Sequence, residues 1–388
     1  MRKQKRRMLL LTILNFLFPK KKNSLFFYDI NGISMNEIAM IQYLLRNHLD
    51  MKYDIAIITN QPEQVSRIIP ETFVHRNDVK GLLKQLRAKY IFLEQNSHEW
   101  SVYRTPSQKI IQLWHGLPIK KVGYLHNPSP LYAYDRVYSH VLAPSEYGWE
   151  IMKKCFRYSD YKKIICSPPR CDLLKNTISV EQYQALGLDL NRKLIVWMPT
   201  FRNNITETER QYGCEFPLLT EAEIHRLDDF LEENGMQIII KPHSLQKQIN
   251  AFKRTYKHIY VFENFDLFIH GVDPYTLLGT AECLITDYSS VVYDYMLLDR
   301  PIIFTIDDLE NFKSVRGFIE DDYMSFFAGA CVDSYESLIV ELKKALAHID
   351  QDVYDSLRLK RNQCINQYQD FAFCERVFRS LGIIDESQ

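Results

Sequence analysis

Several common nucleotide-binding and hydrolase motifs are missing from this sequence of 388 residues. It contains neither GxGxxG nor GxxxxGKS/T, which excludes a dinucleotide fingerprint and a P-loop, and it has no GxSxG nucleophile elbow. Its eight cysteines include no CxxC pair, so we expect reduced thiols, mostly in the core, rather than a zinc site. The net charge is zero, which argues against a nucleic-acid-binding protein that depends on a basic field.

The N-terminus lacks an apolar run of transmembrane length. Residues 8–18, MLLLTILNFLF, would rise only about 16 Å as a helix, against a hydrocarbon core of about 30 Å. PKKK follows them instead of a small-residue cleavage site. Residues 1–22 contain eight Lys and Arg and no acidic residue. We expect this segment to lie on an anionic membrane surface, peripherally on the cytoplasmic face of the cell membrane. The alternative is a frayed helix packed on the domain.

Short apolar runs alternate with helical patterns along the rest of the chain. This alternation predicts an α/β fold with parallel sheets and crossover helices, and the length predicts two domains. The expected strands lie in residues 24–30, 53–59, 89–95, 109–116, 139–145, 162–169, 193–202, 236–244, 258–264, 282–290 and 300–308. The expected helices include residues 35–49, 78–89, 219–234, 290–298, 335–348 and 352–379.

A polar stretch around residues 175–192 separates two halves of similar size. The predicted organisation is therefore a membrane-associating segment and two Rossmann-like domains followed by a C-terminal helix. Their expected bounds are 1–22 for the segment, 23–180 for the first domain, 181–350 for the second domain and 351–388 for the helix.

Four chemically rich motifs follow predicted strands: WHG, MPTFR, KPH and TDYSS. Ligands bind beyond the carboxyl ends of parallel strands, so we expect these motifs to line a cleft between the two domains. TDYSS opens a short helix, where Ser289 or Ser290 could act as N-cap and the free N–H groups could bind an anion. A plain N-cap with no ligand is the alternative. Asp287 would repel a phosphate and is expected to orient a serine or a ligand hydroxyl.

The neighbouring strand ends add cations and hydroxyl groups. Thr200 and Arg202 belong to MPTFR, and Lys241 belongs to KPHS. Arg202 offers a planar fork that suits phosphate, and Lys241 offers a point charge. Together with the serines they favour an anionic ligand over unrelated, solvated strand ends. The acid clusters at 307–308 and 320–322 are typical of solvated loops, and no DxD pattern accompanies the strand ends, so we expect no metal ion and no cofactor.

The WHGLPIKK stretch gives the first half its acid/base candidate. His115 has an imidazole suited to accept a proton from an attacking hydroxyl, and Gly116 would let an acceptor approach the backbone. Lys120 and Lys121 could bind an acceptor phosphate or be solvated.

These motifs, in this order, resemble the CDP-glycerol glycerophosphotransferase family of teichoic acid primases and polymerases. The resemblance covers about residues 110–345 and rests on WHGLPIKKVG, APSEY, PPRCDLL, MPTFRNN, KPHS, LITDYSSVVYDYMLLDRPIIF and RGFIEDD. It implies a GT-B fold with an acceptor-side domain at 23–180 and a donor-binding domain at 181–350, whose C-terminal helix crosses back to the first domain. It also implies catalytic roles for His115 and His243 and a donor-binding role for Ser289 and Ser290. The sequence departs from the family pattern in two places. It has SPPRCD where the family often has GxPRxD, and IEDDY follows RGF. These departures bear on which alditol is transferred and which acceptor is used.

The implied reaction transfers an alditol phosphate, with glycerol phosphate expected, from a CDP-alditol to a hydroxyl group and releases CMP. The implied acceptor is a glycan linked to a polyprenyl diphosphate lipid, in teichoic acid or capsule-type synthesis. Two alternatives stay open, namely a GT-B glycosyltransferase that uses a nucleotide sugar and a non-catalytic subunit of a polymer assembly complex. The sequence leaves the oligomeric state open, including a homo-oligomer.

Overall fold

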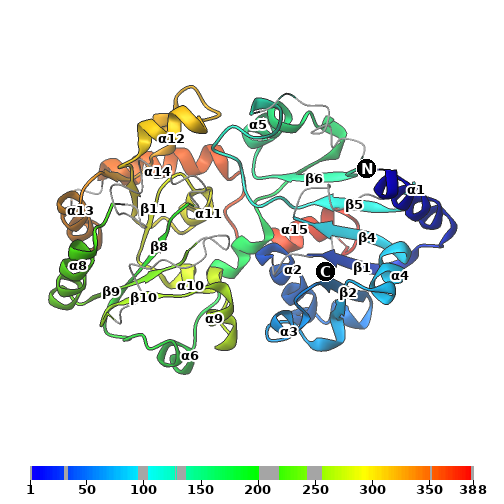
Figure 1. Ribbon diagram of the computed structural model, residues 1–388, viewed down its shortest axis with the longest axis horizontal. Helices are drawn as coiled ribbons and strands as arrows, with labels where there is room; N and C mark the ends of the chain where they lie inside the picture. The colour runs from blue at the N-terminus through cyan, green and yellow to red at the C-terminus, as the bar shows by residue number, and fades with distance from the viewer. Residues whose placement is uncertain are drawn as a thin grey trace. The chain divides into compact units, whose positions relative to one another are not determined.

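The computed structural model describes residues 2–29, 34–94, 104–126, 128, 137–200, 218–242, 256–349 and 352–385, except the side chains of 2–9 and 352. Contacts divide the chain into two compact units (Figure 1). The first unit comprises Met1–Leu117, Val122–Leu173 and Asn366–Gln388, and the second comprises Pro118–Lys121 and Leu174–Ile365. The four residues of PIKK therefore belong to the second unit, although they lie inside the first half of the sequence.

The first unit contains a seven-stranded parallel sheet in the order β3-β2-β1-β4-β5-β6-β7. Its strands are β1 (Lys21–Tyr28), β2 (Asp54–Thr59), β3 (Val74–Arg76), β4 (Ala88–Leu93), β5 (Lys109–Gln112), β6 (His140–Ala143) and β7 (Lys163–Ile165). Its helices are α1 (Arg2–Leu17), α2 (Met35–Arg46), α3 (Pro62–Val65), α4 (Val79–Arg87), α5 (Glu146–Phe156) and α15 (Phe373–Ser380), with the 3-10 segment η7 (Pro169–Lys175) at its end.

The second unit contains a six-stranded parallel sheet in the order β10-β9-β8-β11-β12-β13. Its strands are β8 (Lys193–Met198), β9 (Met236–Ile240), β10 (Ile259–Val261), β11 (Cys283–Thr286), β12 (Ile302–Thr305) and β13 (Ala330–Val332). Its helices are α6 (Val180–Ala185), α8 (Glu221–Glu233), α9 (Asn264–Ile269), α10 (Pro274–Thr280), α11 (Val291–Tyr295), α12 (Leu309–Val315), α13 (Tyr335–Ala347) and α14 (Asp352–Ile365).

Both sheets have the doubly wound order, in which the first strand of the unit lies beside the fourth. The strand order reverses between β1 and β4 in the first unit and between β8 and β11 in the second. A reversal of this kind splays the connections apart at the carboxyl edge and leaves space for a ligand there. The fold therefore contains two ligand-binding edges of the same topology.

Local sequence explains the central elements. The central strands are continuous apolar runs such as Leu25–Phe27 and Ile238–Ile240, which are buried on both faces, as parallel sheets require. Helix α8 begins at a capping box, in which the Thr220 hydroxyl accepts from the Glu223 N–H and the Glu223 carboxylate accepts from the Thr220 N–H. Its apolar face packs on the sheet around Trp197 and Ile238.

The C-terminal region differs in one respect from the single predicted helix over 352–379. The structure has two helices there, α14 in the second unit and α15 in the first. Asp172 of the PPRCD motif accepts hydrogen bonds from the N–H groups of Phe373 at 2.9 Å and Cys374 at 2.8 Å, at the start of α15. The Phe378 ring then packs edge-on against Phe92 of β4. The last helix therefore packs in the first unit, as the GT-B resemblance implied.

Candidate functional site

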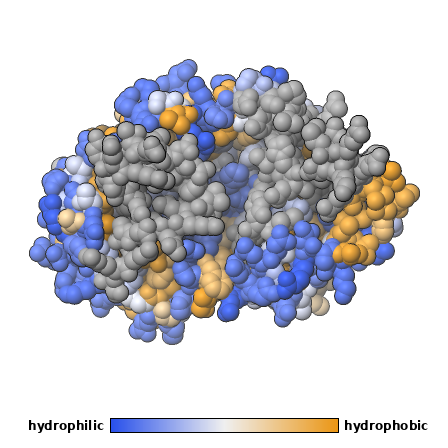
Figure 2. All heavy atoms as spheres, viewed as in Figure 1, coloured by the Kyte–Doolittle hydropathy of each residue, from blue (hydrophilic) through white to orange (hydrophobic). Residues whose placement is uncertain are grey.

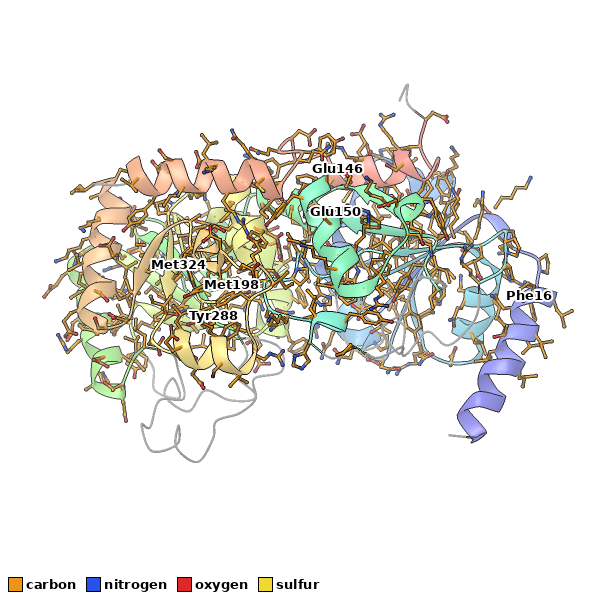
Figure 3. The ribbon with its side chains drawn as sticks, turned by 90° about the horizontal axis from the view of Figure 1, so that it is seen from above. Phe16, Glu146, Glu150, Met198, Tyr288 and Met324 are labelled. Carbon is orange, nitrogen blue, oxygen red and sulfur yellow. The ribbon has the colours of Figure 1, made fainter. Side chains whose placement is uncertain are left out.

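A hydrogen-bonded side-chain bridge connects the two loops at the point where the strand order of the second sheet reverses. Thr200 lies two residues after β8, and Asp287 directly follows β11. The Thr200 N–H donates to both carboxylate oxygens of Asp287, at 3.0 and 2.9 Å, and the Thr200 hydroxyl also donates to this carboxylate. Met198 and Tyr288, labelled in Figure 3, mark the two strand ends. The bridge fixes the two loops that border the reversal point.

Asp287 is fully buried, and its carboxylate accepts hydrogen bonds from Thr200 rather than from a serine. Both oxygens are engaged by donors from the protein, which reduces their repulsion toward a nearby anion. Asp287 is expected to orient a serine or a ligand hydroxyl, and the hydroxyl group bound to it in the structure is that of Thr200, which is neither. The two partners are 87 positions apart, which explains why spacing along the chain did not predict this pairing.

Ser290 stands at the N-cap position of α11, but its side chain makes no capping hydrogen bond. The Ser289 hydroxyl accepts from the Val291 N–H at the long distance of 3.5 Å. The predicted N-cap position is therefore correct, although the predicted capping interaction is not formed. Both serines are partly exposed at the carboxyl edge of the sheet, where their hydroxyl groups can meet a ligand.

Lys241 directly follows β9, the strand beside β8. Its N–H donates to the Trp197 carbonyl at 2.9 Å, so the lysine lies at the same edge as Thr200. Burial lowers the pKa of Lys241 to about 8, and the Glu263 carboxylate opposes this shift only in part. The predicted donor residues Arg202 and His243 lie outside the described residues.

Residues 118–121 form an antiparallel bridge with the RGF segment of the second unit. Lys120 pairs with Phe318, the Lys121 N–H donates to the Gly317 carbonyl at 3.2 Å, and the Ile319 N–H donates to the Ile119 carbonyl at 2.9 Å. Burial, followed by the charge of Arg316, lowers the pKa of Lys120, while the Asp287 carboxylate raises it. The Lys120 ammonium group thus interacts with the Asp287 carboxylate, whereas Lys121 is exposed.

In the first unit, the WHG motif forms a tight turn after β5. Trp114 has a φ of 54°, in the left-handed region that a bulky residue seldom adopts, and Gly116 has a φ of 108°. The Trp114 ring is buried and stacks on Phe156 with 4.4 Å between centroids, while His115 is exposed. A mostly apolar pocket beside this turn is lined by Leu113, Trp114, Gly116, Leu117, Leu142, Ala143, Pro144, Met152, Cys166 and Pro168.

Three largely buried acidic residues, which the sequence analysis missed, lie where the strand order of the first sheet reverses. Asp29 follows β1, Glu94 follows β4, and Glu37 lies in the first turn of α2. Burial, and then the carboxylates of Asp29 and Glu94, raise the pKa of Glu37 well above its usual range. The sequence signal for this acidic cluster is that Asp29 and Glu94 each directly follow a central strand.

The described residues hold neither a metal-binding cluster nor a membrane-crossing helix. These residues contain no group of three or more His, Cys, Asp or Glu side chains placed to hold a metal ion. No helix in the same part of the chain has both the length and the apolar character that a membrane crossing needs.

The two parallel-sheet α/β units, whose chemically rich residues lie at the carboxyl ends of the strands, define a protein with the GT-B fold. A model of the CDP-Glycerol:Poly(glycerophosphate) glycerophosphotransferase family matches residues 10–382, and the chain belongs to this family. The resemblance that its motifs carry is thereby confirmed, as is the expectation of a phosphotransferase enzyme.

Similar proteins agree with this assignment. The chain is 27% identical over 352 residues to a teichoic acid glycerol-phosphate transferase of Staphylococcus aureus (strain NCTC 8325 / PS 47), covering 83% of this chain and 84% of that protein. It is also 27% identical over 380 residues to the teichoic acid ribitol-phosphate polymerase TarL of the same strain, covering 89% of this chain but 63% of that protein.

The fold is shared with a solved structure. The wall teichoic acid polymerase TagF superposes with a TM-score of 0.76 at 18% identity, covering 98% of this chain and 94% of that one. At this identity the likeness concerns the fold, and it confirms the predicted architecture of two Rossmann-like domains.

Proposed function

We propose that the chain transfers glycerol phosphate from CDP-glycerol to a hydroxyl group of a lipid-linked acceptor and releases CMP. The acceptor would be a glycan carried on a polyprenyl diphosphate, and the product a teichoic acid or capsule-type polymer. Family membership supports the donor and the reaction type. The relatives support the same polymer class, since one is named as a glycerol-phosphate transferase and another as a ribitol-phosphate polymerase.

The observation that carries this proposal is the arrangement of three adjacent strand ends in the second unit. Lys241 follows β9, Thr200 follows β8, and Asp287 with the two serines follows β11, in a sheet where these strands are neighbours. We assign the donor diphosphate to this edge. Lys241, Arg202, His243 and the hydroxyl groups of Ser289 and Ser290 would stabilise the charge that develops on the departing CMP.

His115 is the proposed general base of the reaction. It would take the proton of the acceptor hydroxyl while that oxygen attacks the β-phosphorus of the donor. The new O–P bond forms as the bond from phosphorus to the CMP oxygen breaks, and the electron pair of that bond leaves with CMP. No covalent enzyme intermediate is needed, so we expect inversion at phosphorus.

The proposed acceptor contacts come from the WHGLPIKK stretch. Gly116 would let the acceptor approach the backbone, and exposed Lys121 would meet an acceptor phosphate. Lys120 was predicted on the acceptor side as well. Because it shares its surroundings with Asp287, we now assign it to the donor.

Helix α1 supports the proposed contact with an anionic membrane surface. Leu10, Ile13 and Leu17 recur at helical spacing, and with Phe16 their side chains are 49–72% exposed. They form the apolar patch over α1 in Figure 2, and Phe16 is labelled in Figure 3. Asn15 is buried and donates to Gln108 at 2.9 Å, which anchors the other side of the helix. Lys20 turns inward to the Asn15 side chain, at 3.0 Å.

Mass spectrometry of the product tests the function. The chain would be incubated with a short lipid-linked acceptor and, in separate reactions, with CDP-glycerol, CDP-ribitol and a panel of UDP-sugars. The expected result is addition of glycerol phosphate with stoichiometric CMP. A ladder of products identifies a polymerase and a single addition a primase, whereas turnover of a UDP-sugar alone would overturn the proposal in favour of a glycosyltransferase.

The His115→Ala variant tests the base. It should bind CDP-glycerol with parental affinity but lower the transfer rate by about 100-fold or more, the usual contribution of general base catalysis. Turnover within a few-fold of the parent would mean that another group takes the proton.

A further inference from the structure

The main chain of the WHG turn is held by side chains from three other parts of the first unit. Asn36 comes from the first turn of α2, Glu94 follows β4, and Arg170 comes from η7. All three are largely buried, with side-chain exposures of 7% for Arg170 and 14% for Glu94 and with Asn36 fully enclosed. Glu94 lies beside the WHG turn because β4 and β5 are neighbours in the sheet.

Arg170 contacts the carbonyl of His115 itself. Its guanidinium Nη2 donates to this oxygen at 3.0 Å, and Nη1 lies 3.7 Å from Glu94 Oε1. The planar fork of an arginine can hold two partners in fixed directions, which the ammonium group of a lysine cannot reproduce. Arg170 therefore links the backbone of the turn to the charge at the end of β4.

Asn36 holds the preceding peptide. Its amide Nδ2 donates to the Trp114 carbonyl at 2.8 Å and to Glu94 Oε2 at 3.1 Å, and its Oδ1 accepts from the Arg170 N–H at 3.1 Å. Both peptide carbonyls around His115 are thus engaged, one by Asn36 and one by Arg170. The left-handed conformation of Trp114 costs energy, and such a conformation persists only where its surroundings enforce it.

We propose that Arg170, Asn36 and Glu94 are positioning residues for the reaction, which fix the backbone on both sides of His115 and thereby the direction of its imidazole toward the acceptor hydroxyl. This inference rests on the proposed role of His115 as general base. The three residues do not touch the reacting atoms. They act by keeping an exposed side chain on a rigid, strained turn, and misplacement of a catalytic group by about 1 Å can cost about 100-fold in rate.

Glu37 provides a matched control. It is the neighbour of Asn36 in the same helical turn and is equally buried, but its carboxyl oxygens have no hydrogen-bond partner among the described atoms. Burial and the neighbouring carboxylates raise its pKa and so favour its neutral form, whose shape Glu37→Gln keeps. A fall of kcat in this variant would show how sensitive the buried cluster is to any substitution.

The experiment compares Arg170→Lys, Asn36→Ala and Glu37→Gln in the full chain by steady-state kinetics with CDP-glycerol and by calorimetric titration of donor binding. We expect kcat to fall about 10- to 100-fold in the first two variants, with donor affinity, binding stoichiometry and Tm close to parental. Glu37→Gln should keep parental kcat. Guanidinium far below denaturing concentrations should restore part of the activity of Arg170→Ala but not of His115→Ala.

Each outcome decides the proposal. Parental kcat in Arg170→Lys or Asn36→Ala would overturn it, as would equal losses in all three variants, which would indicate a general loss of packing. A reduced binding stoichiometry that accounts for the whole loss of kcat would also overturn it, because the defect would then lie in folding. If the parent does not turn over CDP-glycerol, or if His115→Ala is fully active, the proposed function or the base fails instead.

Discussion

The proton on Lys241 gives a direct test of donor binding by the second unit. This lysine is partly buried at the end of β9, and burial lowers its pKa to about 8. A lysine with this pKa is charged below about pH 8 and neutral above it. A bound diphosphate is stabilised by the charged form, so donor affinity should fall as the pH rises through this value.

The magnitude follows from the pKa. The protonated fraction of such a lysine falls from about 0.9 at pH 7 to about 0.1 at pH 9. If only the charged form binds the donor, the Kd for CDP-glycerol should rise about ten-fold over this range, or about 1.4 kcal/mol. At about pH 8, binding should also take up about half a proton, which calorimetry in buffers of different ionisation enthalpy would detect.

Two lysine-to-arginine variants distinguish the titration of Lys241 from that of Lys120, whose pKa is also lowered. An arginine stays charged throughout this range. Lys241→Arg should therefore bind CDP-glycerol with a nearly constant Kd, while Lys120→Arg should keep most of the parental slope. A ten-fold rise that persists in Lys241→Arg, or that disappears only in Lys120→Arg, would refute the assignment of this titration to Lys241.

Three further predictions concern the bridge, the last helix and the N-terminal helix. Asp287→Ala should weaken CDP-glycerol binding more than Thr200→Val in a titration, because it removes every acceptor of the bridge rather than one donor; equal effects would argue against the bridge. Asp172→Ala should lower Tm by several degrees, since loss of a helix cap costs about 1–2 kcal/mol, and Asp172→Asn should recover part of the loss; an unchanged Tm would contradict the capping role. The double variant Phe16→Ser, Leu17→Ser should reduce binding to anionic vesicles about ten-fold in a flotation assay. Parental flotation would show that α1 does not contact lipid.

The sequence predicted the central elements well because their information is local. A run such as Ile238–Ile240 reads as a buried strand wherever it occurs, and all eleven predicted strands coincide with strands of the structure. The edge strands β3 and β13 were missed, since three residues each carry too short a pattern. The break between α14 and α15 was missed too, because helical spacing continues on both sides of it.

The site was predictable only in its outline. Strand-end positions correctly brought Thr200, Lys241 and Asp287 to one edge, because parallel strands share their carboxyl ends. The partner of each side chain depends on strand order and loop path, which one sequence does not encode locally. The Arg170 contact with the His115 carbonyl and the pairing of Lys120 with Phe318 both depend on this long-range geometry.

The two reversal points share a topology but differ in charge, and this difference bears on where the donor binds. In the first unit, the residues that follow β1 and β4 are Asp29 and Glu94, and the guanidinium of Arg170 is already engaged by Glu94 and a carbonyl. An anionic diphosphate placed there would meet carboxylates. In the second unit, the carboxylate of Asp287 is occupied by Thr200 and interacts with Lys120, and Lys241 follows the adjacent strand β9. Electrostatics therefore supports the proposed assignment of the donor diphosphate to the second unit rather than to the first.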